Sequence, residues 1–306
     1  MSSPRPKLII ILGPTASGKS ELAVKLALRF NSEQLKKKFG INGVEIISAD
    51  SRQVYKGMNI GTGKITKKEM RGIPHHLLDV ASPKKKFTVV RYQKLAIKAA
   101  NKILRKKKIP LLVGGSPFYI YSVTEGWLFP KLKPDWKLRK KLEKKSASEL
   151  FKILKKLDEK RAKTIETKNK RRLIRAIEIC KKLGKVPQIK KTPQFDCLLI
   201  GIKKSPQELK ILINNRLLKR FNKGMVGEVK NLRKSGLSWK RLEEFGLEYR
   251  WIARFLQKKI SYSEMVKILQ KDIEKFSKRQ ITWFKSDKRI HWIKNQKDAE
   301  NLIKKF

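Results

Sequence analysis

The sequence predicts an α/β fold, in which a parallel sheet is flanked by helices and a helical insertion domain interrupts the sheet-forming chain. Three observations predict it. Short apolar runs of strand length are followed by longer segments with helical periodicity. The first of these runs leads into a glycine-bounded turn and then a helix. A strongly basic helical stretch separates the earlier apolar runs from the later ones.

The first predicted unit consists of a strand at residues 8–12, a turn at 13–20 and a helix at 21–30. One helix face carries the apolar side chains of Leu22, Ala23, Leu26, Ala27 and Phe30. The turn is Gly13-Pro14-Thr15-Ala16-Ser17-Gly18-Lys19-Ser20, which matches the pattern of a phosphate-binding loop, or P-loop. The sheet is therefore predicted to be of the P-loop type.

The chemistry of this turn suits a phosphorylated ligand. Gly13 and Gly18 allow successive backbone N–H groups to point at an anion, and the helix N-terminus adds partial positive charge. Lys19 can reach a terminal phosphate, while the Ser20 hydroxyl can ligate Mg²⁺. An accidental match in a lysine-rich chain is the alternative, and the flanking strand and helix weigh against it. We expect the loop to bind a diphosphate or polyphosphate.

The charge of the chain is extreme. Its 77 Lys and Arg residues against 26 Asp and Glu residues leave a net charge of +51, which a polyanion or a high-salt cytoplasm would neutralise. AT-rich codon usage, which inflates lysine everywhere, is an alternative cause. The apolar share of 40% is sufficient for a folded core.

We expect a cytoplasmic protein without a membrane segment. Cys180 and Cys197 have no zinc-binding spacing and are predicted to be buried thiols in a reducing compartment. The apolar run at residues 7–12 is too short for a signal peptide, and no stretch approaches membrane-spanning length.

Two further strands are predicted to end beside the phosphate-binding loop. The strand at 44–47 ends in a polar cluster that includes Asp50, and the strand at 110–113 ends in Gly114-Gly115-Ser116. The carboxyl ends of parallel strands face the ligand crevice, so we expect Asp50 and Ser116 to lie in the site. Capping of the next turn is the alternative role for Asp50.

The histidines and remaining elements follow from local pattern. For His75 and His76 in a loop, hydrogen bonding is favoured over metal ligation because no third ligand stands at a helpful spacing.

Strands are predicted at 196–202 and 290–293, and helices at 87–107, 206–221, 225–234 and 263–284. The expected core positions are Val90, Leu95, Ile97, Ala99 and Ile103 in the first of these helices, and Met265, Leu269, Ile273, Phe276 and Trp283 in the last.

A separate basic lobe is predicted within the chain. Residues 131–175 hold 19 basic and 6 acidic residues, a net +13 in a predominantly helical pattern. The predicted domains are a P-loop catalytic core at 1–126, a basic helical insertion at 127–190 and the rest of the core at 191–306. Arg171, Arg172 and Arg175 suit bidentate phosphate contact, and a merely solvated surface is the alternative for the lysines.

Several motifs in one order resemble those of the tRNA dimethylallyltransferase (tRNA isopentenyltransferase) family. They are GPTASGKS, IISADSRQVYKGMNIGTGK, GIPHHLLD, PLLVGGSPFYI, RRLIRAIEICKKLGK and KRQITWFK, spread over residues 7–285. Ser116 replaces the threonine that is usual in the family but keeps a hydroxyl, and Arg171 replaces a glutamine. The late Gly-Tyr-Arg motif is spaced differently, at residues 246–250. The eukaryotic zinc finger is absent from this sequence, which suits a bacterial-type member.

The resemblance implies transfer of the prenyl group of dimethylallyl diphosphate to the exocyclic amine of an adenine. That adenine lies immediately 3′ of the anticodon in tRNAs that read codons beginning with U. Asp50 is implied as general base, with Ser116 near the reacting amine and Lys19 at the diphosphate. The base must leave its stack to enter the pocket. We expect Mg²⁺ as cofactor, tRNA as partner and a monomer.

The expected site residues fall into three groups. Diphosphate binding is assigned to Gly13, Pro14, Thr15, Ala16, Ser17, Gly18, Lys19, Ser20 and Arg216. Contact with tRNA is assigned to Asp50, Ser51, Arg52, Gln53, Arg171, Arg172 and Arg175. Metal ligation is assigned to Ser20.

Three other functions remain open at this point. A small-molecule P-loop kinase shares the loop but needs no basic lobe. A non-catalytic RNA-binding protein leaves Asp50 and Ser116 without a role. A prenyltransferase acting on free AMP needs no grip on a nucleic acid.

Overall fold

The computed structural model describes residues 4–306, apart from the side chains of Lys38 and Phe39. The chain forms two compact units. One unit combines Met1–Gly126 with Pro193–Phe306, and the other is Trp127–Thr192. The insertion expected at 127–190 thus differs by two residues from the second unit.

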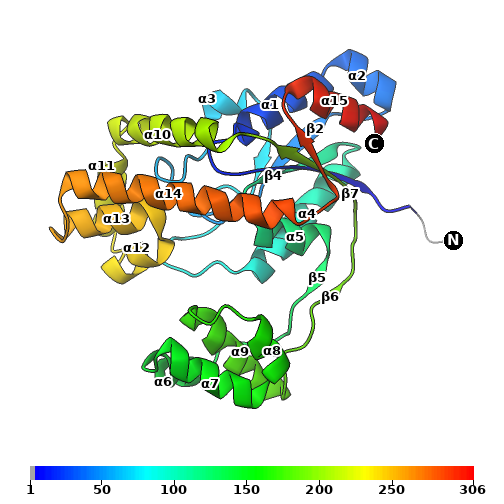
Figure 1. Cartoon of the computed structure of the whole chain (residues 1–306). Coiled ribbons are helices and arrows are strands. Elements are labelled where there is room, and N and C mark those ends of the chain that lie inside the picture. The colour runs from blue at the N-terminus through cyan, green and yellow to red at the C-terminus, as the bar shows by residue number, and fades with distance from the viewer. Residues whose placement is uncertain (1–3) are drawn as a thin grey trace. The chain divides into compact units, whose positions relative to one another are not determined.

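A six-stranded sheet lies in the first unit (Figure 1). Its strand order is β3-β2-β4-β1-β7-β8, and every neighbouring pair is parallel. The strands are β1 Lys7–Leu12, β2 Val44–Ser48, β3 His75–His76, β4 Ile109–Gly114, β7 Asp196–Ile202 and β8 Ile290–Ile293. The predicted parallel α/β sheet is confirmed, with β1 at its centre beside β4 and β7.

Helices cover both faces of this sheet. Ile9 and Ile11 pack in the core cluster that includes α1 (Lys19–Phe30) and α15 (Gln296–Lys305). The residues that alternate with them along the strand are also fully buried, namely Leu8, Ile10 and Leu12. Because successive strand residues point to opposite faces, β1 is buried on both sides, as its continuous apolar run indicates. The second face is approached by α4 (Val89–Arg105), which packs on β2 and β4, and by α5 (Pro117–Thr124), which packs on α4.

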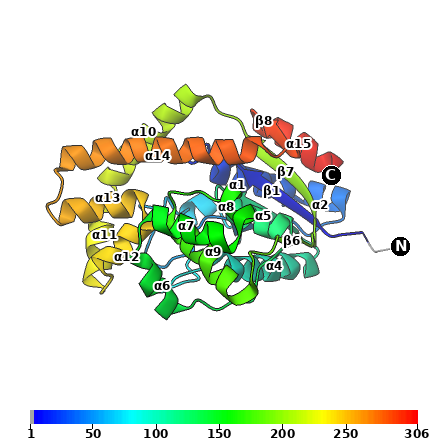
Figure 2. The ribbon, with the colours of Figure 1, turned by 60° about the horizontal axis from the view of Figure 1, so that its bottom comes forward.

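A group of helices follows β7 in the first unit. They are α10 Pro206–Asn222, α11 Met225–Lys234, α12 Trp239–Phe245, α13 Leu247–Leu256 and α14 Tyr262–Lys285. The long α14 lies beside α13 and also packs on α10 (Figure 2). Sequence pattern did not predict α12 and α13, α5 or α15. It did not predict the short helices α2 (Glu33–Phe39) and α3 (Lys67–Met70) either.

Two expected core positions, Val90 and Trp283, are exposed, and Leu95, Ile97 and Phe276 are only half-buried, because the phase of each helix differs slightly from the predicted one. In α4 the buried side chains are Tyr92, Ala96, Ala99, Ala100 and Ile103, whereas Val90 is 50% exposed. In α14 the predicted Met265, Leu269 and Ile273 are buried, but Trp283 is 43% exposed and Phe284 takes its place. Gln280, a polar residue outside the predicted apolar face of this helix, is also buried.

The second unit is helical and has a core of its own. It contains α6 Trp136–Glu143, α7 Ala147–Leu157, α8 Glu159–Thr164 and α9 Lys170–Leu183. A short antiparallel pair, β5 (Trp127–Leu128) with β6 (Lys190–Lys191), joins the two ends of the unit. Leu142, Leu150, Leu154, Leu173 and Ile177 form its hydrophobic centre.

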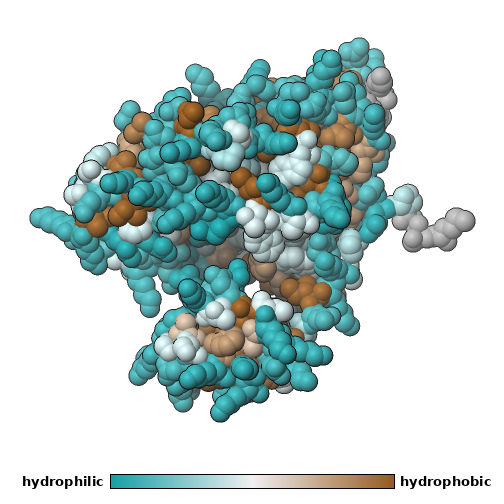
Figure 3. Space-filling model, in the orientation of Figure 1, coloured by the Kyte–Doolittle hydropathy of each residue, from teal (hydrophilic) through white to brown (hydrophobic). Residues whose placement is uncertain are grey.

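Hydrophilic residues dominate the face of the molecule drawn in Figure 3, with small hydrophobic areas between them. Among the described helices, none is both long enough and apolar enough to cross a membrane. Both cysteines are free thiols: Cys180 is buried, and Cys197 is half-buried with its pKa raised to about 12 by burial and then by Asp196.

Candidate active site

The phosphate-binding loop joins β1 to α1 at the carboxyl edge of the sheet. Its backbone has positive φ at Gly13 (+151°), Ala16 (+64°) and Gly18 (+88°), and glycine adopts such angles without strain. No side chain caps the N-terminus of α1. The N–H groups of its first turn therefore remain available to an anion.

Two cations converge on this loop. The Lys19 ammonium donates to the Pro14 carbonyl and, at 3.3 Å, to the Ser17 hydroxyl. Arg216, from α10, donates to the Thr15 hydroxyl at 3.3 Å. Burial, followed by the charge of Arg216, lowers the pKa of Lys19 to about 7. Burial, followed by the charge of Arg220, lowers the pKa of Arg216 to about 10. An anion between these cations would relieve their mutual repulsion.

Arg220 lies one turn after Arg216 but has a different environment. It donates to Glu248 at 2.9 Å and to the Gly61 carbonyl at 3.1 Å. Arg216 has no carboxylate partner among the described residues. A Cβ at Gly63 would overlap both guanidinium groups, and the φ of +57° at this position also favours glycine. Arg220 thus ties α10 to the loop at 57–64.

Asp50 and Ser116 meet at the same edge of the sheet. The Ser51 N–H donates to the Ser116 hydroxyl at 3.1 Å. Gly114 makes this approach possible, because a Cβ there would overlap the carbonyl of Ala49. The expectation that the ends of β2 and β4 lie together agrees with this geometry.

Both proposed roles of Asp50 are compatible with the structure. Its Oδ1 accepts from the backbone N–H groups of Arg52 at 2.7 Å and Gln53 at 3.2 Å, which is a capping role. Its Oδ2 has no hydrogen-bond partner in the described part of the chain. One oxygen thus holds the turn, and the other remains available to a substrate.

The side chains that follow Asp50 are engaged within the protein. Arg52 donates through Nε to the Phe245 carbonyl at 2.9 Å. Gln53 donates to the Gly63 carbonyl at 3.2 Å and accepts from the Ser48 hydroxyl at 3.2 Å. These contacts order the turn and the loop at 57–64.

The two adjacent histidines form hydrogen bonds, as predicted, although they lie on the edge strand β3 and not in a loop. His76 Nε2 lies 2.8 Å from Glu45 Oε2, and His75 Nδ1 lies 2.8 Å from the Ile73 carbonyl. Burial lowers the pKa of His75. Within residues 4–306, no three His, Cys, Asp or Glu side chains are grouped so that they could hold a metal ion.

Comparison with known proteins identifies the family. A family model described as IPP transferase matches residues 53–287. The chain belongs to the IPP transferase family. It is 38% identical over 307 residues to the tRNA dimethylallyltransferase of Acetivibrio thermocellus, covering 97% of this chain and 94% of the relative. It is 39% identical over 305 residues to that of Finegoldia magna, covering 96% and 92%. The resemblance inferred from the motifs is confirmed.

Solved structures of the same family share the fold. The tRNA isopentenylpyrophosphate transferase of Bacillus halodurans superposes with a TM-score of 0.69 at 32% identity, covering 95% of this chain and 90% of that chain. The corresponding enzyme of Staphylococcus epidermidis gives 0.70 at 32% identity, covering 99% and 100%. A eukaryotic dimethylallyltransferase acting on tRNA gives 0.76 at 26% identity, covering 94% and 74%.

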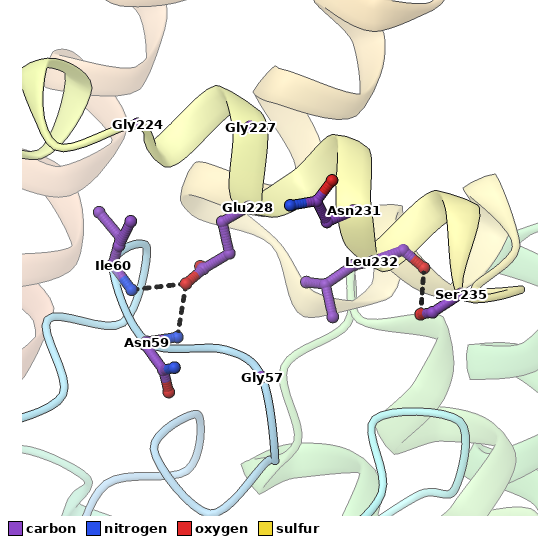
Figure 4. Close-up of a pocket in the computed structure, with 9 residues that line it drawn as sticks. All are labelled: Gly57, Asn59, Ile60, Gly224, Gly227, Glu228, Asn231, Leu232 and Ser235. Carbon is purple, nitrogen blue, oxygen red and sulfur yellow. Dashed lines mark hydrogen bonds between the residues drawn. The ribbon is translucent and has the colours of Figure 1, made fainter.

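Sequence reasoning missed Glu228, which organises a loop of this IPP transferase. Its carboxylate accepts from the N–H groups of Asn59 (2.7 Å), Ile60 (2.6 Å) and Gly61 (3.0 Å), and from the Tyr249 hydroxyl at 2.9 Å. Figure 4 shows Glu228 on α11 pointing at this loop, and the carboxylate and the loop both line a cavity. No residue of the phosphate-binding loop lines the cavity, so we assign it no part in binding the diphosphate. The late Gly-Tyr-Arg motif, which contains Tyr249, was the available signal.

The three arginines of the insertion differ from one another. Arg175 donates to Glu178, a fully buried carboxylate that also accepts from Arg139 at 2.7 Å. Arg175 also donates to the Leu132 carbonyl at 3.2 Å. Arg171 and Arg172 are exposed, and Arg172 lies 3.2 Å from Glu166 in a solvent-exposed ion pair. The geometry therefore gives Arg175 a role in folding the unit.

Proposed function

We propose that this IPP transferase transfers the dimethylallyl group from dimethylallyl diphosphate to the exocyclic amine of the adenine immediately 3′ of the anticodon. The tRNAs are those that read codons beginning with U, and the products are isopentenyladenosine and diphosphate. One observation is the main support for the proposal. The anion-binding loop at residues 13–20, which Lys19 and Arg216 contact, lies at the same edge of the sheet as Asp50. One oxygen of the Asp50 carboxylate has no hydrogen-bond partner among the described residues. The relatives named tRNA dimethylallyltransferase support it.

In the donor half, residues 13–20 bind the diphosphate. Negative charge grows on its oxygens as the carbon–oxygen bond of the donor breaks. Lys19 and Arg216 stabilise that charge, and electrostatic stabilisation of this kind is usually the largest catalytic effect. Before the donor binds, Lys19 donates to the loop's own Pro14 carbonyl, so it must turn toward the diphosphate.

The loop also fits Mg²⁺ as a cofactor. The Ser20 hydroxyl, at the start of α1, is exposed and has no hydrogen-bond partner in the part of the chain that the structure describes. Mg²⁺ is commonly held by one or two protein oxygens together with substrate phosphates and water. When bound there, it would neutralise charge on the leaving diphosphate.

In the acceptor half, Asp50 takes the proton of the adenine amine through Oδ2 as the new carbon–nitrogen bond forms. Its Oδ1 remains fixed by two backbone N–H groups, which holds the carboxylate in a constant orientation. The Ser116 hydroxyl is held by the Ser51 N–H and lies beside the base. A general base at this position is worth about 10²–10⁴ in rate.

The insertion supplies the grip on tRNA in this proposal. Arg171 and Arg172 contact backbone phosphates of the anticodon arm while the target adenine is extruded from its stack. The path by which the adenine reaches Asp50 is lined by Ser51, Arg52 and Gln53. We also propose that the enzyme is a monomer and that it is located in the cytoplasm, where tRNA is found.

A transfer assay with labelled compounds tests this function. The enzyme is incubated with labelled dimethylallyl diphosphate and either tRNA or free AMP, and separately with labelled ATP. We expect label from the prenyl donor in tRNA only, without ATP hydrolysis. Transfer to AMP would favour an adenylate prenyltransferase, and phosphate transfer from ATP would favour a kinase.

A further inference from the structure

Gln280 is a buried amide near the C-terminal end of α14, and both of its polar atoms form hydrogen bonds. Its Oε1 accepts from the Thr15 N–H at 2.8 Å, and its Nε2 donates to the Gly115 carbonyl at 2.5 Å. The residue is 5% exposed. Ser277, one turn earlier on the same face, is also buried, but its hydroxyl has no partner among the described residues. Both residues are buried, but only Gln280 of these two uses its side chain to form hydrogen bonds, one through each polar atom.

The two ends of the Gln280 amide reach different halves of the site. Thr15 belongs to the phosphate-binding loop, and its hydroxyl accepts from Arg216. Gly115 immediately precedes Ser116, whose hydroxyl accepts from the Ser51 N–H next to Asp50. A single side chain thus connects the loop that holds the leaving group to the residues that face the nucleophile.

The surrounding backbone leaves room for this amide and little else. A Cβ at Gly115 would stand 2.5 Å from Gln280 Nε2 and 3.1 Å from the Gly13 carbonyl. The helix that carries Gln280 packs along α10 and α13, so the amide has a rigid support. The amide thus holds the loops that follow the neighbouring strands β1 and β4 at a fixed separation.

We propose that Gln280 is a positioning residue for prenyl transfer, which fixes the diphosphate-binding loop relative to Asp50 and Ser116. The proposal rests on the proposed function. In the reaction the donor's carbon–oxygen bond breaks and its electron pair leaves with the diphosphate. The adenine nitrogen forms the new bond to that carbon, and its proton passes to Asp50. The reacting carbon must lie between the leaving oxygen and the attacking nitrogen, and a misplacement of about 1 Å can cost about 10²-fold in rate.

The first test replaces Gln280 by methionine, which has similar volume but forms neither hydrogen bond. We expect kcat to fall about 10–100-fold, while the KM values for donor and tRNA change by less than about threefold. Ser277→Ala is the matched control on the same buried face, and its kcat should equal that of the wild type. Melting temperatures of all variants are measured, and kcat is determined well below the lowest of them.

The second test uses Gln280→Glu, which keeps the acceptor for Thr15. A neutral glutamic acid can also donate to the Gly115 carbonyl, and burial favours the neutral form. The ratio of its kcat to that of the wild type should therefore rise as the pH falls. A purely structural contribution to packing would leave this ratio constant.

The outcomes are distinct. A wild type that fails to transfer label to tRNA would overturn the proposed function. An active wild type with an equally active Gln280→Met variant would overturn the role of Gln280 alone. If the methionine variant does not fold, the glutamate variant decides, and a pH-independent kcat ratio would then overturn the proposal.

Discussion

Arg220 and Glu248 form an ion pair at 2.9 Å, with side chains that are only 10% and 12% exposed. This pair separates the roles of two arginines that stand one helical turn apart. Arg220 is neutralised within the protein, whereas Arg216 is left as a buried cation that faces the phosphate-binding loop.

Arg216→Gln should weaken donor binding, while the unliganded protein becomes no less stable, because a buried and repelled charge is removed. Arg220→Gln should lower the free energy of unfolding by about 3–5 kcal/mol, because it leaves Glu248 buried without its partner. Calorimetric titration with dimethylallyl diphosphate and thermal unfolding without ligand measure the two effects. Equal losses of stability in both variants would contradict this division of roles.

The pKa of Lys19 predicts a pH dependence in the unliganded protein. Burial, followed by Arg216, lowers this pKa from 10.5 to about 7. Between these values the unfolded chain binds more protons than the folded one, so this group makes stability rise with pH across that window. The sign follows because burial disfavours the charged form in the folded state. Chemical unfolding between pH 7 and 10 should show this rise, and Lys19→Met should reduce it.

Donor binding should reverse the effect on Lys19. The diphosphate favours the charged ammonium, so binding above about pH 7 takes up a proton at this residue. Titration at pH 8.5 in two buffers of different ionisation enthalpy measures the uptake. Lys19→Met should bind the donor more weakly and take up correspondingly fewer protons, and an unchanged uptake would exclude Lys19 as its source.

Asp50→Asn separates the two functions of the Asp50 carboxylate. Asparagine keeps an Oδ1 that can accept from Arg52 and Gln53, but it cannot take a proton, so kcat should fall by about 10²–10⁴. The melting temperature and tRNA affinity should change little. Asp50→Ala is the comparison, and it should also lower stability because two backbone N–H groups lose their acceptor. Near-normal turnover by the asparagine variant would leave Asp50 with the capping role alone.

The basic insertion should be distinguishable from a general solvated surface by salt dependence. If Arg171 and Arg172 contact tRNA phosphates, replacing both by Gln should flatten the plot of log affinity against log salt by about 0.7–0.9 per lost contact. Lys155 and Lys156, exposed on α7 of the same unit, provide the control pair. Donor affinity measured without tRNA should stay constant. Equal salt slopes for both double variants would refute the assignment.

Much of the catalytic edge could be predicted because its signals are local. The apolar strand, the glycine-bounded loop and the helix stand in one continuous stretch, and Asp50 and Ser116 each follow a strand directly. Gln280 was not predicted, because a glutamine within a helix usually faces solvent and its partners lie 165 and 265 residues away in the chain. The structural role of Arg175 was not predicted for a different reason: Glu178 is only three residues away, but the burial of that carboxylate is not evident from the sequence.

The paired strands β5 and β6 place the exit and the return of the chain at the insertion side by side, with Trp127 opposite Lys191. A segment whose ends meet in this way can change in length or be exchanged without altering the path of the chain through the parallel sheet. Under the proposed function, the grip of the insertion on tRNA and the prenyl chemistry of the core can therefore diverge independently. A graft of a relative's insertion between these two strands should leave donor binding intact while it changes the set of tRNAs that are bound.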